Sequence, residues 1–284
     1  PLMPVRIHNI QLGLDEAVER LAAKAAERIG LARDRVKAWR LARRSVDARG
    51  AEVRFVCSVD LEIDDADRAR ALAAGASTAD EALAAAPALR PGDEEARGRF
   101  VVVGCGPAGL YAAVRLAENG YRPLVIERGR PVAERIGHVN AFLAGGDLDP
   151  ESNLLFGAGG AGTFSDGKLR TGISDPRVAE VLRRLAEAGA PAEILCDARP
   201  HAGTDRLRLV VEKLCRHVEE CGGEIRWGVR VDGLRTQGGS LCGFETSAGP
   251  VESSVALMAP GPYADDTFAM LARCGVAVQA KPFQ

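Results

Sequence analysis

The sequence predicts an α/β fold in two parts: a small β-α-β-β domain, then a larger domain built on a parallel sheet. Apolar residues alternate with mostly polar ones from Val53 to Ile63, which is typical of a half-buried strand. The apolar run Phe100–Val103 leads directly into a glycine-rich turn and a helical pattern, as in a βαβ unit. The chain has 284 residues, 46% hydrophobic and 27% charged, which leaves room for two globular domains.

The first 65 residues contain the elements of half a ferredoxin-like domain. Val5–Leu14 is expected to be a strand, and apolar residues at helical spacing then run from an N-cap at Asp15 to a stop at Gly30. Val36–Val46 is expected to pair as a hairpin with the alternating strand described above. Together these elements predict a small domain over residues 1–65.

The composition changes over residues 66–98. Alanine dominates this stretch, and Pro87 and Pro91–Gly92 interrupt any regular element near its end. We predict a linker here, partly helical, followed by a second domain over residues 99–284.

The second domain begins with a strand, a turn, a helix and a strand, in that order. The turn is Gly104-Cys105-Gly106-Pro107-Ala108-Gly109, and the helix after it ends at Asn119–Gly120. The next strand, Tyr121–Ile126, is followed by Glu127, 23 positions after Gly104. This order predicts dinucleotide binding, with Glu127 accepting hydrogen bonds from ribose hydroxyl groups.

The residues of the turn have separate physical tasks. Gly104 permits the sharp turn, Gly106 lets a pyrophosphate approach the backbone, and Gly109 lets the helix pack closely on the sheet. Pro107 and Ala108 open the helix, whose first N–H groups attract phosphate. The alternative is a glycine-rich turn that only packs one helix. The motif alone does not choose between FAD and a nicotinamide cofactor.

Later elements bear on that choice. Thr204–Cys221 is expected to be a helix. Three strands are expected after it, and a run of small residues follows them: Glu224–Leu234, Leu241–Thr246 and Val251–Met258, then Ala259-Pro260-Gly261.

This order resembles the FAD-binding half of two-dinucleotide-binding-domain flavoproteins. In those proteins a β-meander leads to a strand that ends in an Ala-Thr-Gly-like signature beside the cofactor, whereas Pro260 stands in place of the Thr here. The resemblance implies a Rossmann-like FAD-binding domain with a β-meander over residues 99–284. It also implies that FAD contacts Val231, Ala259 and Gly261.

A second resemblance is to a largely uncharacterised family of predicted FAD-dependent dehydrogenases. The motifs that carry it are Ser152-Asn153, the glycine-rich run Phe156–Leu169, Pro200–Asp205 and Lys281-Pro282-Phe283. Two departures from the family pattern are Ala158, where an acidic residue is expected, and Met258–Thr267, which replaces a Gly-His-Ser-Ala-Arg-Asp-Thr-like run.

The glycine-rich run offers bare backbone to a flat ligand. Gly159, Gly160 and Gly162 permit close approach of a cofactor, and Thr163 and Ser165 are expected to hydrogen-bond the edge of a flavin ring. The alternative is a structural Ω-like loop. A second phosphate-binding turn is rejected, because no strong strand precedes the run.

Four charged or titratable residues are further candidates for the site. Arg128 is assigned to cofactor binding, and Arg135 is either a pyrophosphate clamp or a surface arginine. Lys168 and His201 are the candidate catalytic residues. Lys168 would place positive charge near a reduced, anionic flavin. His201 either lines the substrate side or is a loop histidine bonded to backbone.

Composition and patterning exclude several classes of function. The formal charge of −2 gives no positive field for nucleic acid or anionic lipid. No apolar run approaches the roughly 20 residues that span a bilayer, and the first residues lack a signal-peptide core. Seven scattered cysteines and the four histidines form no metal-binding pattern. We expect a cytoplasmic protein with reduced thiols, no metal, and no nucleic-acid or membrane partner.

The predicted function is that of an FAD-dependent oxidoreductase for a small-molecule substrate, with NAD(P)H as a candidate electron donor. The alternatives are an NAD(P)-dependent dehydrogenase and a truncated, non-catalytic nucleotide-binding fragment. Flavoproteins of the resembled architecture insert a substrate domain after the meander, and Gln284 ends the chain where that insertion would begin. We therefore expect a C-terminal substrate domain or a partner chain to complete the pocket.

Overall fold

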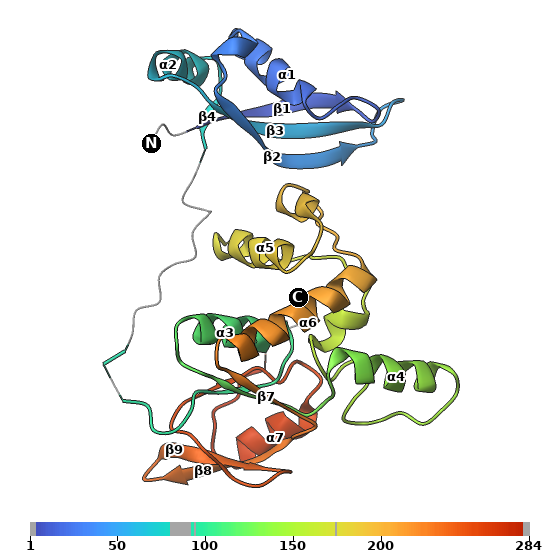
Figure 1. The fold of residues 1–284 in the computed structure, drawn as a ribbon, viewed down its shortest axis with the longest axis vertical. Coiled ribbons are helices and arrows are strands. Elements are labelled where there is room, and N and C mark those ends of the chain that lie inside the picture. Colours follow the sequence, from blue (N-terminus) through green and yellow to red (C-terminus); the bar gives the residue numbers. More distant parts are fainter. Residues whose placement is uncertain (1–3, 80–91, 94, 174, 281–284) are drawn as a thin grey trace. The chain divides into compact units, whose positions relative to one another are not determined.

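The computed structural model describes residues 4–79, 92–93, 95–173 and 175–280 (Figure 1). The chain divides into two compact units: unit 1 is residues 1–87 with 168–202, and unit 2 is residues 88–167 with 203–284. Residues 80–91 and 94 of the predicted linker, and the motif Lys281-Pro282-Phe283, lie outside the described residues. The sequence prediction assigned all of residues 99–284 to the second domain, whereas residues 168–202 belong to unit 1.

Unit 1 is built on a four-stranded antiparallel sheet with the strand order β2-β3-β1-β4. Its strands and first two helices are β1 (Val5–Gly13), α1 (Arg20–Arg28), β2 (Ala38–Asp47), β3 (Arg54–Glu62), α2 (Asp65–Ala73) and β4 (Ser77–Thr78). Alternate residues of β1 and β3, such as Leu12 and Val59, are buried against Leu21 and Ala25 of α1. The predicted β-α-β-β order is therefore found in β1, α1, β2 and β3.

Two local features of unit 1 differ from the prediction. Helix α1 begins at Arg20 rather than just after Asp15, because residues 14–19 form turns. The start of the predicted linker is structured: it forms α2 and β4, and β4 pairs with β1 through Val5 and Thr78. The buried residue of α2 is Ala71, and so short a side chain gives little hydrophobic periodicity in the sequence.

Residues 168–202 extend the edge of the unit 1 sheet. They contain α5 (Arg177–Glu187) and the 3₁₀ helix η4 (Ala192–Leu195), neither of which was predicted. The Arg44 N–H donates to the Cys196 carbonyl over 2.7 Å, and the Ala198 N–H donates to the Arg44 carbonyl over 2.8 Å. The Arg44 guanidinium also donates two hydrogen bonds to Asp197. Residues 196–198 are therefore bound to β2 by two backbone hydrogen bonds and by an ion pair.

Unit 2 contains a four-stranded parallel sheet with the order β11-β5-β6-β7 and a separate antiparallel sheet with the order β10-β9-β8. The strands are β5 (Val101–Val103), β6 (Leu124–Glu127), β7 (Glu224–Trp227), β8 (Val231–Gln237), β9 (Ser240–Thr246), β10 (Val251–Glu252) and β11 (Ala256–Met258). The helices are α3 (Pro107–Glu118), α4 (Val132–Leu143), α6 (Thr204–Glu220) and α7 (Asp265–Arg273), with the 3₁₀ helix η3 at Gly160–Phe164.

The two faces of the parallel sheet bury different cores. Val102 and Val125 pack with apolar residues of α3 and α6, whereas Val101 and Ile126 pack with the antiparallel sheet and α7. Successive residues of β5 and β6 point to opposite faces, so Val101–Val103 and Leu124–Ile126 are apolar on both faces. Unit 2 is thus a Rossmann-like α/β domain, as the βαβ motif predicts.

Two predicted strands are each divided between the two sheets of unit 2. Glu224–Leu234 separates into β7 and β8, and the chain turns at Gly228, which has a φ of 67°. Val251–Met258 separates into β10 and β11, and between them the Ser253 hydroxyl lies 2.7 Å from the carbonyl oxygens of both Arg99 and Val255, either of which can accept its proton. Both halves of each run pack apolar side chains against a core, although those of β11 are only partly buried.

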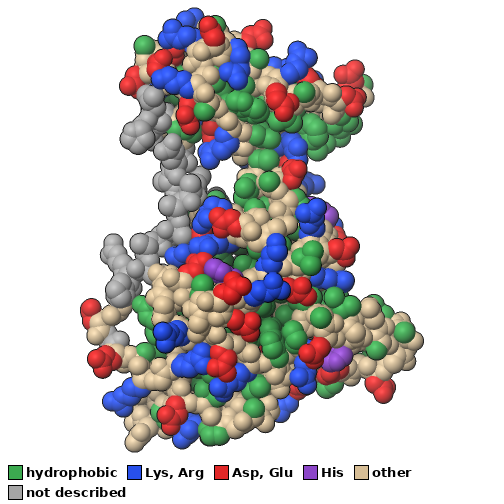
Figure 2. Space-filling view, viewed as in Figure 1, with side chains coloured by type: hydrophobic (Ala, Val, Ile, Leu, Met, Phe, Trp, Pro, Cys, Tyr) green, Lys and Arg blue, Asp and Glu red, His purple; other side chains and the backbone are tan. Residues whose placement is uncertain are grey.

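The surface is mixed in charge. Lys and Arg side chains are interspersed with Asp and Glu over the face shown in Figure 2. Within the described residues, no helix is both long enough and apolar enough to span a membrane.

Gly109 supplies a test of the packing of α3. A Cβ at this position would overlap the carbonyl oxygen of Gly104, so we expect Gly109→Ala to lower the free energy of unfolding by about 3 kcal/mol. Gly137, inside α4, has no neighbour within 4 Å of a Cβ. Gly137→Ala is therefore expected to raise the free energy of unfolding by about 1 kcal/mol. Urea denaturation of both variants measures these changes, and equal effects would contradict the packing described.

Candidate functional site

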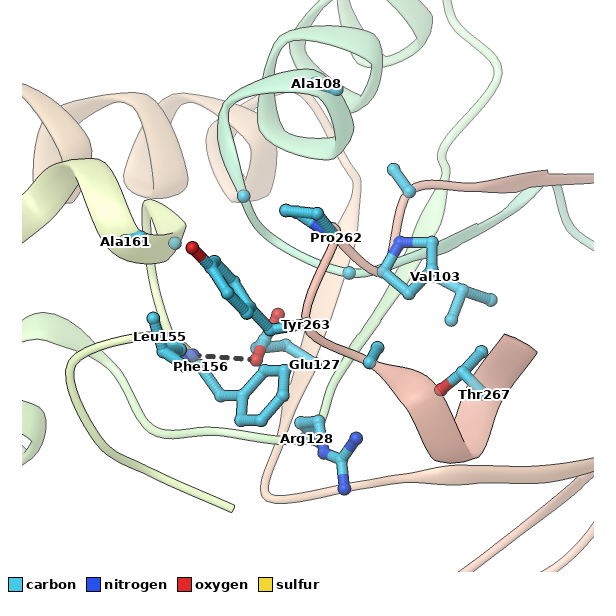
Figure 3. Close-up of a pocket in the computed structure, with 18 of the residues that line it drawn as sticks. Val103, Ala108, Glu127, Arg128, Leu155, Phe156, Ala161, Pro262, Tyr263 and Thr267 are labelled. Atoms are coloured by element: carbon cyan, nitrogen blue, oxygen red, sulfur yellow. Dashed lines mark hydrogen bonds between the residues drawn. The ribbon is translucent and has the colours of Figure 1, made fainter. Parts of the chain in front are cut away.

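Unit 2 contains a cavity of about 410 Å³ at the carboxyl ends of β5 and β6 (Figure 3). Parts of five segments and one further residue line it: residues 103–108 except 105, 126–128, 155–157 with 160–162, 229–231, 259–264, and Thr267. Ligands of open α/β sheets bind at this end of the strands, where the loops leave the sheet. The cavity is therefore the candidate binding site.

The three glycines of the turn have different surroundings. Gly104 has a φ of 97°, and a Cβ there would overlap the Ala259 carbonyl oxygen; Gly109 packs just as closely on Gly104. Gly106 has an ordinary φ of −71°, and the nearest atom to a Cβ there is the Gly160 Cα at 4.0 Å. Gly104 and Gly109 are thus required by the fold, whereas Gly106 leaves open space in the wall of the cavity.

Helix α3 presents its N-terminus to the cavity. Gly106 is its N-cap, Pro107 and Ala108 are its first residues, and all three line the cavity. The first intrahelical hydrogen bond runs from the Leu110 N–H to the Gly106 carbonyl. The N–H groups of the first turn therefore lack helical partners, and the positive end of the helix dipole faces the site.

Glu127 holds three segments of the cavity wall together. Its carboxylate is 5% exposed and accepts N–H hydrogen bonds from Cys105 at 2.6 Å, Gly129 at 2.8 Å and Gly157 at 3.0 Å. Figure 3 shows it between the segments that these residues belong to. A carboxylate has about four acceptor positions, so one is left for a ligand hydroxyl. Its predicted contact with ribose stays a prediction.

An ion-pair network lies at the rim of the cavity. Arg128 donates to Glu151 at 2.6 Å and to both oxygens of Asp266, and its guanidinium lies 4.5 Å from the centre of the Phe156 ring. Arg230 donates to the other oxygen of Glu151. Burial opposes ionisation of Glu151, but the hydrogen bonds from both arginines outweigh it and lower the pKa of that carboxyl. Hydrogen bonding to Arg128 also lowers the pKa of Asp266.

Arg135 lies away from the cavity. It is fully buried on α4, where Nε donates to the Asn153 carbonyl and Nη1 to the Ala158 carbonyl. Its Nη2 has no hydrogen-bond partner among the described residues. Burial lowers the pKa of its guanidinium to about 10. The structure thus gives Arg135 neither of its two predicted roles: it supports the glycine-rich run from behind and is not a surface residue.

The glycine-rich run contributes only part of the predicted contacts. Gly160 and Gly162 line the cavity. Gly159 does not, because its Cα faces Val211 of α6 and the Thr163 hydroxyl. Thr163 is fully buried and donates to the Ala158 carbonyl.

Ser165 also bonds within the run, since its hydroxyl donates to the Gly162 carbonyl at 2.7 Å. The hydroxyl groups of Thr163 and Ser165 therefore stabilise the run, and neither residue lines the cavity. A second phosphate-binding turn would be followed by an α-helix. The run instead forms only the short 3₁₀ helix η3.

The two candidate catalytic residues lie opposite one another. Lys168 and His201 form an isolated antiparallel bridge next to the hydrogen bond from the Leu169 N–H to the Pro200 carbonyl. Both side chains are exposed, and neither residue lines the cavity. Both residues belong to unit 1, and their predicted catalytic role stays a prediction.

Several lining residues were predicted, and others were not. Val231, Ala259 and Gly261 line the cavity as the resemblance implies. Tyr263 and Arg230 also line it and were not predicted. An exposed loop side chain has no periodicity, so the sequence carries no local signal for its direction. Within the described ranges, no group of three or more His, Cys, Asp or Glu residues could hold a metal ion.

Two family models match parts of the chain. An NAD(P)-binding Rossmann-like domain matches residues 102–148, which contain the glycine turn, Glu127 and α4. A domain of unknown function (DUF8436) matches residues 4–62, the β-α-β-β part of unit 1. The Rossmann-like match agrees with the parallel sheet of unit 2.

Individual proteins match longer stretches. An uncharacterized protein of Clostridium beijerinckii is 35% identical over 282 residues, 99% of this chain and 53% of that protein. Protein FixC of Shigella flexneri is 28% identical over 166 residues, 57% of this chain and 36% of that protein. The chain thus spans about half or less of these relatives. The L-proline dehydrogenase of P. horikoshii superposes with a TM-score of 0.44 and 15% identity, covering 64% of this chain and 57% of that one.

Replacing Glu127 by Gln tests its role in the cavity wall. The side-chain NH₂ of the new glutamine is a donor and cannot accept a hydrogen bond, so at least one of the three buried N–H groups would lose its acceptor. We therefore expect the free energy of unfolding to fall by about 1–3 kcal/mol. Glu134→Gln on the exposed face of α4 is the matched control and should change it by less than about 0.5 kcal/mol. Chemical denaturation compares the two, and similar small effects would contradict the bonding described for Glu127.

The ion-pair network predicts a pH-dependent contribution to stability. Because the pKa values of Glu151 and Asp266 are lowered from their ordinary 4.5 and 3.8, their contribution is present above those values and is lost as the pH falls. We expect Arg128→Gln to be less stable than the wild type by up to about 1 kcal/mol at pH 7. Denaturation at several pH values should show this difference shrinking below about pH 4. A difference that does not depend on pH would contradict the prediction.

Proposed function

We propose that unit 2 binds FAD in its cavity and that the chain is the dinucleotide-binding part of an FAD-dependent oxidoreductase. The observation that carries the proposal is Gly106, a glycine that neither backbone strain nor packing requires, in the wall of a cavity at a helix N-terminus. Bare backbone at such a position suits a ligand that must approach the main chain closely.

A second glycine of the cavity wall has the same property. Gly162 lines the cavity, has no positive φ, and has no neighbour within 4 Å of a Cβ. The wall thus contains two uncrowded glycines, and one of them is the N-cap of α3, where unpaired N–H groups favour a diphosphate. Glu127 lies at the end of the neighbouring strand and has one acceptor position left, which suits a ribose hydroxyl.

The elements after α6 favour FAD over a nicotinamide cofactor. The β-meander of the resembled flavoproteins corresponds to β8, β9 and β10, and Val231 at its start lines the cavity. Ala259 and Gly261, at the positions of the Ala-Thr-Gly-like signature, line it as well. Bound FAD would supply hydride-accepting chemistry, while the protein supplies binding and orientation.

The second candidate function is NAD(P) binding by the same cavity, as in an NAD(P)-dependent dehydrogenase. It is favoured by the match of residues 102–148 to an NAD(P)-binding Rossmann-like domain. The substrate, NAD(P)H as electron donor, and a substrate domain or partner chain stay proposals, since the chain spans about half of its relative from C. beijerinckii. A cytoplasmic location is likewise a proposal.

The decisive experiment is purification followed by an absorption spectrum and titration with FAD, NAD⁺ and NADP⁺. The proposal predicts the visible band of oxidised flavin in the purified protein, or FAD binding tighter than that of either nicotinamide dinucleotide. Binding of NAD⁺ or NADP⁺ without FAD would favour the second candidate. Bleaching of the flavin band by NADPH or NADH under anaerobic conditions would separate an oxidoreductase from a fragment that only binds nucleotide.

The glycine turn gives a further prediction. Gly106→Val would place two methyl groups in the space assigned to the diphosphate, so we expect FAD affinity to fall at least about a hundredfold. Stability should fall by only about 1 kcal/mol, the cost of a poor N-cap. Isothermal titration and denaturation measure the two effects. Gly137→Val, an equally uncrowded glycine outside the cavity, is the control and should leave affinity unchanged.

A further inference from the structure

Tyr263 is a large aromatic side chain that the fold does not bury. It is 61% exposed, yet it lines the cavity. In Figure 3 its ring extends from the loop before α7 across the cavity toward Ala161, on the same side as Leu155 and Phe156. An exposed aromatic ring contributes little to the core, and because this ring lines the candidate site it is available to a ligand bound there.

The loop that carries Tyr263 is stiff. It joins β11 to α7 through Ala259-Pro260-Gly261-Pro262, where each proline fixes its own φ and Gly261 adopts a φ of 83°. The N–H of Ala259 is held by the Val103 carbonyl at 2.8 Å, and α7 begins two residues after Tyr263. Little backbone freedom is left to lose when a ligand meets the ring, which favours affinity.

Apolar side chains also line the wall beside the ring, and a contact holds one of them in place. Leu155 and Phe156 line the cavity, and the guanidinium of Arg128 holds the Phe156 ring in place from a distance of 4.5 Å. A stiffly mounted aromatic ring above an apolar wall suits a flat ring system that can stack on it.

We propose that Tyr263 stacks on a planar heteroaromatic ring of the dinucleotide bound in this cavity, and so sets the affinity of the site for that ring. The inference rests on the proposed function, because it assumes a dinucleotide ligand. The ring is either the adenine or the isoalloxazine, which share this chemistry. Tyr263 acts by contact with the ligand and not through another residue.

The test compares Tyr263→Ala with Tyr263→Phe in the full chain. Loss of the ring should weaken FAD binding about five- to hundredfold, as measured for base stacking on aromatic side chains, whereas Tyr263→Phe should stay within about twofold of the wild type. Phe268→Ala is the matched control, because Phe268 is an exposed aromatic of α7 that does not line the cavity. Thermal unfolding of both Tyr263 variants should match the wild type, since the Tyr263 side chain is mostly exposed.

Three probes identify the ring and separate the two proposals. Tyr263→Ala that weakens ADP and FAD alike supports stacking on adenine; weakening of FAD and FMN with ADP unchanged supports stacking on the isoalloxazine. If the wild type binds FAD and Tyr263→Ala binds it equally well, or if Tyr263→Phe is as weak as Tyr263→Ala, the stacking role is overturned while the proposed function stands. If the wild type binds none of the probes, both are overturned.

Discussion

One buried carboxylate determines the form of the cavity. Glu127 accepts N–H groups from the glycine turn, from the residue just beyond its own strand, and from the glycine-rich run 30 residues further along the chain. A buried N–H without an acceptor costs about 1–3 kcal/mol, so three of them in one place require an acceptor of this capacity. A negative charge satisfies all three at once, and it brings together segments that no local pattern would align. Assembly of the cavity wall thus depends on this one side chain.

The parts of the fold that the sequence predicts are those set by local order. The strand, turn, helix and strand from Phe100 to Glu127 occur in succession, and each is recognisable from its own residues. The same holds for β1, α1, β2 and β3. Sheet membership is different, because it depends on pairing between distant segments. The run Val251–Met258 was predicted as one strand, but β10 pairs with β9 whereas β11 pairs with β5. The pairing of residues 196–198 with β2 leaves no trace in either segment alone.

The residues of the candidate site likewise fall into those that the sequence could assign and those that it could not. Gly106, Val231 and Gly261 could be assigned to the cavity because their position in a motif determines which way the backbone faces. The direction of a long side chain is not determined by its position in the sequence. Arg135 points from α4 into the interior, toward backbone carbonyls, while Arg128 reaches the rim and binds two carboxylates. The sequence assigned Arg128 to cofactor binding and left Arg135 as either a pyrophosphate clamp or a surface arginine, and neither prediction included these partners.

The contact between Gly104 and Gly109 has a consequence for redesign of this protein. Strand, turn and helix meet there backbone to backbone, without room for a single additional carbon. Variation in this part of the chain is therefore restricted to changes that keep the main chain where it is. The rim is more tolerant, because Arg128 and Arg230 meet Glu151 through long, partly exposed side chains. An engineer who wishes to alter ligand preference has freedom at the rim that the turn does not offer.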